Sequence, residues 1–235
     1  MSVKKNVASL AIFTLLLLGM VSFAFDIKPA KSEWTGTVYI RADGSIDPPN
    51  APIITYDKVT YTLIGDITST GNGIVVQRDN VVIDGAGYDI NGAGGGTGVD
   101  LSDRKSVVVK NLTIAKFAYG VYLGYWGAKG NLITLNKIVD NEYGIYTDYF
   151  SDNNIIVGNL FANNEYGIDI HTDHNVIFDN HITTNYVGIL IIAGSSDNNV
   201  TGNFIINNKI GISVDGSYFN VVSDNYIVLN GEAFV

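Results

Sequence analysis

One short phrase built on asparagine recurs five times between residues 131 and 230. In each copy an Asn is followed by four residues, a second Asn, four more residues and a third Asn. The copies are Asn131/Asn136/Asn141, Asn154/Asn159/Asn164, Asn175/Asn180/Asn185, Asn198/Asn203/Asn208 and Asn220/Asn225/Asn230. Self-similarity at a fixed period is the signature of a stacked repeat array. The chain is therefore expected to fold as a solenoid.

A Gly followed by a β-branched residue marks the same point of each unit. The pairs are Gly73-Ile74, Gly98-Val99, Gly120-Val121, Gly144-Ile145, Gly167-Ile168, Gly188-Ile189 and Gly211-Ile212, at intervals of 25, 22, 24, 23, 21 and 23 residues. Each period holds three short apolar segments separated by Asn or Gly turns, and no helical 3.6-residue period runs through it. This pattern predicts an all-β fold, a right-handed single-stranded parallel β-helix of about seven or eight coils of 21–25 residues. A leucine-rich-repeat horseshoe shares the period, but its Leu-x-x-Leu-x-Leu phrase is missing.

Apolar columns two, seven and fourteen residues after the first Asn of each unit are expected to form the core. The first column is Val108, Ile133, Ile156, Ile177, Val200 and Val222; the second is Ile138, Phe161, Ile182, Ile205 and Ile227; the third is Ile145, Ile168, Ile189 and Ile212. The Asn columns are expected at corners, because Asn tolerates left-handed backbone and can hydrogen-bond the next Asn of a stack.

The array is flanked by segments of different character. Residues 1–24 combine Lys4 and Lys5 with an apolar run and a small-residue end, which predicts a signal peptide or, if retained, a membrane anchor. Residues 25–52 are expected to cap the first coil, and residues 53–235 to form the repeat domain. After Asn230 the chain stops in mid-coil without a polar cap, which indicates a truncated solenoid or an end that packs on another subunit.

Composition excludes several classes of function. The chain has no cysteine, so neither a disulfide framework nor a thiolate metal site is available. Its formal charge of −9 argues against nucleic acid as a partner, because phosphate neutralisation needs clustered Lys and Arg.

The outward positions of the Gly-Ile strands carry the candidate functional residues. Side chains alternate along a strand, so Asp169 and His171 point outward when Ile168 and Ile170 point inward. Stacking then places Tyr146 beside Asp169, and Asp148 beside His171. Candidate catalytic residues are Asp148, Asp169 and His171; candidate ligand-binding aromatics, which can stack on sugar rings, are Tyr122, Tyr125, Trp126, Tyr146 and Tyr149.

The repeated phrase Asn-x-Ile-x-x-Asn-x-x-Gly-Ile-x-Ile resembles the parallel β-helix repeats of the NosD-like family, which are related to domains of carbohydrate-binding proteins and sugar hydrolases. The resemblance covers residues 35–235 and rests on core and corner positions. It implies an exported β-helix with polysaccharide as the class of partner, and it names no reaction.

NosD itself is associated with copper delivery, which raises the question of copper ligands in this chain. Copper prefers thiolate, thioether or imidazole ligands. Both methionines, Met1 and Met20, fall in the expected leader, and the three histidines are His171, His174 and His181. His181 lies on a different strand of the coil from the other two, so copper is not expected.

The segment 166–171, Tyr-Gly-Ile-Asp-Ile-His, resembles the Tyr-Gly-Phe-Asp-Pro-His motif of alginate C5-epimerases, whose Asp and His belong to a catalytic face. Carried over, these are Asp169 and His171, although Ile168 and Ile170 depart from the motif. Epimerases and β-eliminating lyases also need a cation that neutralises the substrate carboxylate. The three arginines, Arg41, Arg78 and Arg104, all lie outside the coils around His171, and the polygalacturonase pattern of clustered Asp is absent. An ordinary repeat with polar outward residues is the favoured interpretation of the segment.

Two weaker motifs stand outside this face. The segment 95–100, Gly-Gly-Thr-Gly-Val-Asp, matches one calcium-binding nonapeptide repeat, which leaves calcium open but normally needs tandem copies. Asn111 and Asn199 each begin a glycosylation sequon, and Asn111 is assigned to a corner column.

The sequence thus predicts a secreted or otherwise extracytoplasmic β-helix module. It is expected to bind polysaccharide or cell-surface glycan, or to serve as a cell-surface structural unit, without a cofactor and without catalysis. The alternative is a polysaccharide lyase, C5-epimerase or glycosidase, and a minor alternative is a NosD-type copper accessory protein. Contact with a membrane is expected only if the N-terminal segment is retained.

Overall fold

The computed structural model describes residues 33–124, 127–192 and 194–235, all of which belong to the compact unit Ser32–Val235. The expected signal peptide or anchor, residues 1–24, lies outside the described residues, as does the start of the expected capping segment. No helix in the described part of the chain is long and apolar enough to cross a membrane.

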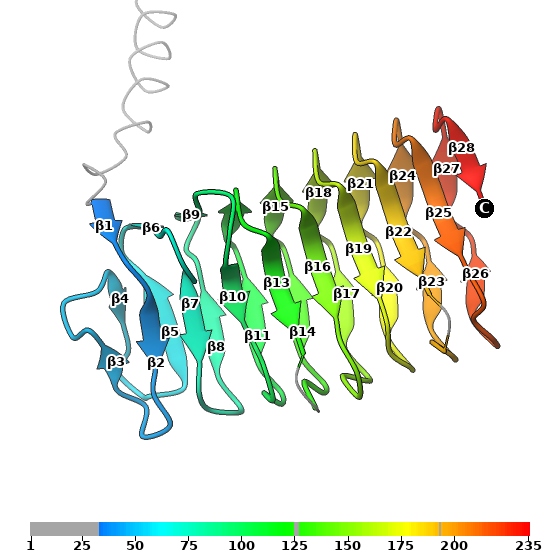
Figure 1. Cartoon of the computed structure of the whole chain (residues 1–235). Helices are drawn as coiled ribbons and strands as arrows, with labels where there is room; N and C mark the ends of the chain where they lie inside the picture. Colours follow the sequence, from blue (N-terminus) through cyan, green and yellow to red (C-terminus); the bar gives the residue numbers. More distant parts are fainter. Residues whose placement is uncertain (1–32, 125–126, 193) are drawn as a thin grey trace, which may run out of the picture. The chain divides into compact units, whose positions relative to one another are not determined.

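The described residues form three sheets that run side by side (Figure 1). Sheet A contains, in order, β1 (Glu33–Thr35), β6 (Asp66–Thr68), β9 (Asp89–Asn91), β12 (Thr113–Ala115), β15 (Lys137–Val139), β18 (Leu160–Ala162), β21 (His181–Thr183), β24 (Phe204–Ile206) and β27 (Tyr226–Val228). Sheet B contains β3 (Ile46–Asp47), β2 (Val38–Ile40), β7 (Ile74–Val76), β10 (Thr97–Asp100), β13 (Tyr119–Leu123), β16 (Tyr143–Thr147), β19 (Tyr166–Ile170), β22 (Val187–Ile191), β25 (Ile210–Val214) and β28 (Glu232–Phe234). Sheet C contains β4 (Ile53–Ile54), β5 (Thr60–Leu63), β8 (Val82–Asp84), β11 (Val108–Lys110), β14 (Leu132–Thr134), β17 (Ile155–Val157), β20 (Val176–Phe178), β23 (Asn199–Thr201) and β26 (Val221–Ser223).

Each turn of the chain adds one strand to sheet C, then one to sheet A, then one to sheet B, as β14, β15 and β16 do (Figure 1). Strands of successive turns pair in parallel, so that β14 pairs with β17 and β16 with β19. The predicted right-handed parallel β-helix is confirmed, with about seven turns. Antiparallel pairs occur at the N-terminal end, where β3 pairs with β2 and β4 pairs with β5.

The predicted apolar columns form the core inside these coils. Ile133, Ile138 and Ile145 of one coil are all completely buried. The assignment of Val108 to the first column was wrong, because its neighbour Val109 is the residue in register with Ile133 and is the buried one. The repeat phrase is incomplete in that coil, so the sequence offered no Asn from which to count.

The asparagine columns lie inside the coils as hydrogen-bonded ladders. The Asn136 backbone N–H and its Nδ2 both donate to Asn159 Oδ1, at 3.0 and 3.1 Å. Asn159 Nδ2 donates in turn to the carbonyl oxygen of Ile133 at 2.8 Å. The predicted Asn-to-Asn stacking is therefore present at buried positions, with Asn159 only 2% exposed.

The left-handed backbone falls one residue before each ladder asparagine, which corrects the expectation that the ladder residues themselves adopt it. Gly158 and Asn163, with φ of 66° and 57°, precede Asn159 and Asn164. Asn111 has φ of 57° and likewise precedes a ladder position, which Leu112 occupies by donating its N–H to Asn136 Oδ1. The assignment of Asn111 to the ladder column was therefore wrong.

Candidate functional site

The outer surface of sheet B carries two adjoining columns of tyrosines. The first column is Tyr119, Tyr143 and Tyr166, contributed by β13, β16 and β19 in register. Its rings stack in succession, with centroids 5.2 Å apart for Tyr119–Tyr143 and 5.0 Å for Tyr143–Tyr166. Each of these residues is half-buried, so each keeps some surface accessible to solvent.

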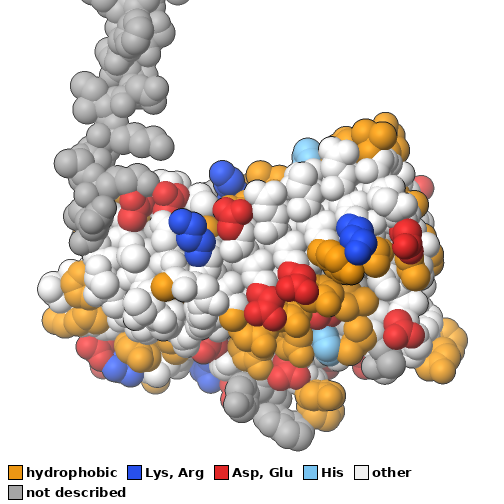
Figure 2. Space-filling view, turned by 45° about the horizontal axis from the view of Figure 1, so that its top comes forward, with side chains coloured by type: hydrophobic (Ala, Val, Ile, Leu, Met, Phe, Trp, Pro, Cys, Tyr) orange, Lys and Arg blue, Asp and Glu red, His pale blue; other side chains and the backbone are white. Residues whose placement is uncertain are grey.

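The second column begins with Tyr122 and Tyr146, whose rings stack with centroids 5.9 Å apart. The columns interlock, because the Tyr146 ring lies 5.3 Å from the rings of both Tyr119 and Tyr143. We refer to Tyr119, Tyr122, Tyr143, Tyr146 and Tyr166 as the tyrosine face. Of the hydrophobic patches on the face that Figure 2 shows, the central one is bordered by acidic side chains and includes a histidine.

The local sequence explains why two tyrosines of one strand share this surface. In β16 the order is Tyr143, Gly144, Ile145, Tyr146, with Ile145 completely buried. A Cβ at Gly144 would lie 2.4 Å from the carbonyl oxygen of Gly167 on the next coil, so only Gly allows this approach. The glycine lets the strand begin at the corner with Tyr143 outward and then continue in ordinary alternation.

Asp169 continues the second column and is buried despite pointing outward. It is in register with Tyr146 on one side and Leu190 on the other, and it is 4% exposed. The His171 Nε2 atom lies 3.1 Å from Asp169 Oδ1, and the imidazole packs 4.7 Å from the Tyr146 ring centroid. Although the two atoms are close, neither makes a hydrogen bond of good geometry. The pair is thus a buried carboxylate and an imidazole beside Tyr146, in continuation of the second column.

Asp148 is directed to the opposite side of this cluster. Its Oδ2 accepts a hydrogen bond of 2.9 Å from the Tyr122 hydroxyl, and its Oδ1 accepts one from the Tyr149 backbone N–H. The structure therefore pairs Asp148 with Tyr122, and Asp169 with His171.

Burial and nearby carboxylates change the acidity of the tyrosines. Burial, followed by the charges of Glu142 and Asp169, raises the pKa of Tyr143 to about 12. Burial, followed by Asp148 and Asp169, raises the pKa of Tyr146 well above its usual value. Burial and the charge of Glu165 likewise raise the pKa of Tyr166. The phenols therefore stay protonated at physiological pH and offer hydroxyl groups rather than a general base.

The structure brings together most of the residues singled out in the sequence. Tyr122, Tyr146, Asp148, Asp169 and His171 belong to one cluster, and Tyr149 is 70% exposed beside Asp148. Tyr125 and Trp126 lie outside the described residues.

Sequence reasoning missed the first tyrosine column. Tyr119, Tyr143 and Tyr166 each stand directly before a Gly of the Gly-β-branched pairs, at intervals of 24 and 23 residues. That regularity is a signal in the sequence, but the repeat period alone also accounts for it.

The three histidines do not converge. His171 faces Asp169, while the His174 Nε2 atom lies 3.8 Å from Asp197 Oδ2. His181 is on sheet A, where its ring packs edge-on against Phe204 at 5.0 Å. Within the described ranges no three His, Cys, Asp or Glu side chains lie where they could hold one metal ion. This donor set does not fit copper, which prefers sulfur or several imidazoles.

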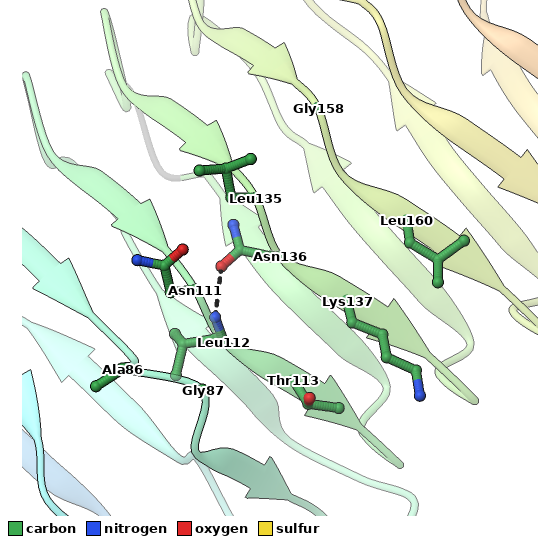
Figure 3. A pocket seen from close by; sticks show the side chains of 10 residues that line it. All are labelled: Ala86, Gly87, Asn111, Leu112, Thr113, Leu135, Asn136, Lys137, Gly158 and Leu160. Atoms are coloured by element: carbon green, nitrogen blue, oxygen red, sulfur yellow. Dashed lines mark hydrogen bonds between the residues drawn. The ribbon is translucent and has the colours of Figure 1, made fainter. Parts of the chain in front are cut away.

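A separate open groove lies on sheet A and the corner before it, with a volume of about 530 Å³. Thr113, Lys137 and Leu160 line it from three successive strands, and Asn111, Leu112, Leu135, Asn136, Ala86, Gly87 and Gly158 complete the lining (Figure 3). The lining is dominated by ladder and corner residues, and Asn136 is held there by the Leu112 N–H (Figure 3). The groove therefore follows from the packing of the corners.

Comparison with known proteins supports the resemblance read from the repeated phrase. Residues 37–233 match the family described as periplasmic copper-binding protein (NosD). No curated protein matches the chain. The family match spans nearly all of the described coils, including every strand that contributes to the tyrosine face. The chain belongs to the NosD family.

Proposed function

We propose that this chain is an extracytoplasmic β-helix module that binds a polysaccharide or cell-surface glycan on its tyrosine face. The observation that carries the proposal is the pair of interlocked tyrosine columns across β13, β16 and β19. The family's description as periplasmic supports a location outside the cytoplasm, and a secreted or cell-surface location is part of the proposal.

The chemistry of the face suits a sugar ligand. An aromatic ring offers apolar contact to a pyranose ring, and a phenol adds a polar edge that can donate and accept hydrogen bonds. The tyrosines repeat at the spacing of adjacent parallel strands, about 4.8 Å. A linear oligosaccharide laid along the solenoid axis meets a pair of phenols on β13 and on β16, and on β19 it meets Tyr166 beside Asp169. Tyr149, exposed at the edge, extends the aromatic surface.

A carbohydrate-active enzyme is the second candidate, favoured by the 3.1 Å contact between Asp169 and His171. Two features weigh against it for uronate substrates. Asp169 is buried, and stabilising an enolate-like intermediate needs a cation near the substrate carboxylate. Between residues 130 and 208 the sequence holds a single Lys or Arg, Lys137, and it lies on β15 of sheet A rather than on sheet B.

Copper binding, which the family's description names, is a third reading. The three histidines of the chain lie apart from one another and the sequence has no cysteine, so copper binding has no role in the proposal. A copper titration followed by the charge-transfer absorbance of the metal tests this reading separately.

The proposal is tested by screening the purified chain on an array of neutral, amino-sugar and uronate glycans. The double variant Tyr143→Ala/Tyr146→Ala should bind its glycan roughly tenfold more weakly, because each aromatic contact contributes about 0.5–1.5 kcal/mol. Tyr226→Ala is the matched control, since Tyr226 is an exposed, stacked tyrosine on sheet A.

The outcomes separate the candidates. Binding that the sheet B variant loses and the Tyr226→Ala control keeps supports the proposal. The proposal is contradicted if the wild-type chain binds no glycan on the array, or if Tyr143→Ala/Tyr146→Ala binds as tightly as Tyr226→Ala. Product formation by the wild-type chain that Asp169→Asn and His171→Ala abolish would favour the enzyme instead; product NMR detects epimerisation as well as cleavage.

A further inference from the structure

Glu142 and Glu165 form an acidic edge along the tyrosine face. They stand one residue before Tyr143 and Tyr166, and backbone hydrogen bonds place them in the same position of successive coils. Both side chains are exposed. Their charges are the next largest cause, after burial, of the raised pKa of Tyr143 and of Tyr166, so each carboxylate lies near its phenol. Adjacent strands are about 4.8 Å apart, so like charges on successive coils repel each other, and a cation bound near both offsets that repulsion.

A lysine ammonium group lies on the same edge of sheet B, two coils after Glu165. The position held by Glu142 and Glu165 is taken by Tyr186 and then Lys209 in the next two coils. The Lys209 Nζ atom lies 4.3 Å from the centroid of the Tyr186 ring and donates to the Tyr186 hydroxyl at 3.0 Å. An ammonium group therefore fits against an aromatic ring at this edge of sheet B, as a cation–π contact.

A buried carboxylate adds to the negative potential behind the rings. Asp169 is 4% exposed, and its Oδ1, which lies 3.1 Å from His171 Nε2, makes no hydrogen bond of good geometry with any described residue. Asp148 contributes a further carboxylate at the other margin, bonded to Tyr122. Lys137, the cationic residue nearest to Asp148 in the sequence, lies on β15 of sheet A. Carboxylates thus lie on both margins of the tyrosine face at β16 and β19. Between residues 130 and 208, sheet B carries no Lys or Arg.

We infer that the ligand of the tyrosine face is an amino-sugar polymer carrying free ammonium groups, and that Glu142 and Glu165 select it over neutral and acidic glycans. This inference rests on the proposed function, because it names the class of glycan bound at the same face. Sugar rings lie against the tyrosine edges, while ammonium groups sit between the carboxylates of successive coils. Uronate polymers are excluded by repulsion from the same carboxylates.

The test compares three hexamers by calorimetry with the full chain at low ionic strength, at a pH where the sugar amine is protonated. These are a glucosamine hexamer, an N-acetylglucosamine hexamer and a lysine hexapeptide. The wild-type chain should bind the glucosamine hexamer roughly three- to tenfold more tightly than its N-acetylated counterpart, in line with two exposed ion pairs. Added salt should shrink this preference.

Charge-matched variants locate the preference. Glu142→Gln/Glu165→Gln should remove most of it. Asp179→Asn/Asp224→Asn makes the same change of net charge at exposed positions beside β20 and β26, where Asn tolerates the left-handed backbone, and should keep it. Circular dichroism establishes that both variants fold.

Each outcome has one meaning. Equal affinity for the two sugar hexamers, or a preference that Glu142→Gln/Glu165→Gln retains, overturns the inference while leaving glycan binding intact. Tighter binding of the lysine hexapeptide, unaffected by Tyr143→Ala/Tyr146→Ala, also overturns it, because charge alone then explains the attraction. Failure of both sugar hexamers and of every array glycan to bind overturns the proposed function along with it.

Discussion

Each ladder asparagine supplies hydrogen bonds that the stacked backbone cannot make for itself. At every corner the strand ladder is interrupted, and the free N–H and C=O groups are buried where water cannot reach them. One side-chain amide accepts from the N–H of the coil before and donates to carbonyl groups nearby, as Asn159 does for Asn136 and Ile133. Leu112 occupies a ladder position but has no side-chain amide. The backbone N–H of Tyr88 in the preceding coil therefore donates to the carbonyl oxygen of Gly85 within a turn.

Replacing one ladder residue should therefore be costly. Asn159→Ala leaves the Asn136 N–H and the Ile133 C=O without their side-chain partner. Because each unsatisfied group costs about 1–3 kcal/mol, the free energy of unfolding should fall by roughly 2–6 kcal/mol. Urea denaturation followed by fluorescence measures it. Asn199→Val is the control: Asn199 points outward, its Oδ1 has no partner, and its column neighbours are Val176 and Val221. Equal stability of the two variants would show that the ladder is dispensable.

The raised pKa of Tyr143 makes stability depend on alkaline pH. The pKa is 10.0 for an ordinary tyrosine and about 12 in the fold, so above pH 10.0 the folded chain holds a proton that the unfolded chain has released. The stabilisation is complete below pH 10.0 and is lost as the pH rises towards 12. The midpoint of urea denaturation should fall across that window, and less steeply in Tyr143→Phe. An unchanged slope in that variant would contradict burial of this phenol.

The strands of sheet B depend on a column of glycines. A Cβ at Gly167 would lie 2.5 Å from the carbonyl oxygen of Gly188, and Gly144 and Gly188 are equally confined. The column was visible in the sequence as the Gly-β-branched pairs. Its consequence for function was not, because the tyrosine before each glycine could not be placed outward until the bend of the strand was known.

We expect Gly167→Ala to destabilise the chain by about 1–3 kcal/mol, as overpacking of a filled interior does. It should also weaken glycan binding, because the added Cβ meets the Gly188 carbonyl oxygen of β22, and the shift of β19 that relieves this contact moves Tyr166. Gly95→Ala provides a matched comparison, since a Cβ there meets no atom within 4 Å. Thermal denaturation and calorimetry report the two effects. Wild-type stability for Gly167→Ala would refute the packing argument.

At the scale of the whole molecule, the period made the fold predictable. Every coil repeats the same three strands, so one reading of the Asn and Gly spacings gave the sheet topology and most of the core. The reading failed where the period is broken. Val107, Leu112 and Phe117 replace the ladder asparagines in their coil, and each donates its N–H to an Asn of the next coil. That is the coil in which Val108 was misassigned.

The site was only partly predictable for a related reason. Alternation along a strand placed Tyr146, Asp169 and His171 on one surface, and the register of β16 and β19 agrees. The pairing of Asp148 with Tyr122 depends on side-chain rotation, which strand register does not determine. The interlocking of the tyrosine columns requires the corner geometry of successive coils.

The central claim is that a glycan lies on the tyrosine face, and the ring resonances of isotope-labelled tyrosines test it most directly. Titration with the glucosamine and N-acetylglucosamine hexamers should shift the resonances of Tyr119, Tyr143, Tyr146 and Tyr166, assigned by single Tyr→Phe variants. Tyr56 and Tyr226, exposed elsewhere, should not move. Shifts confined to Tyr56 or Tyr226, or saturable binding that leaves every ring of the tyrosine face unperturbed, would contradict the account.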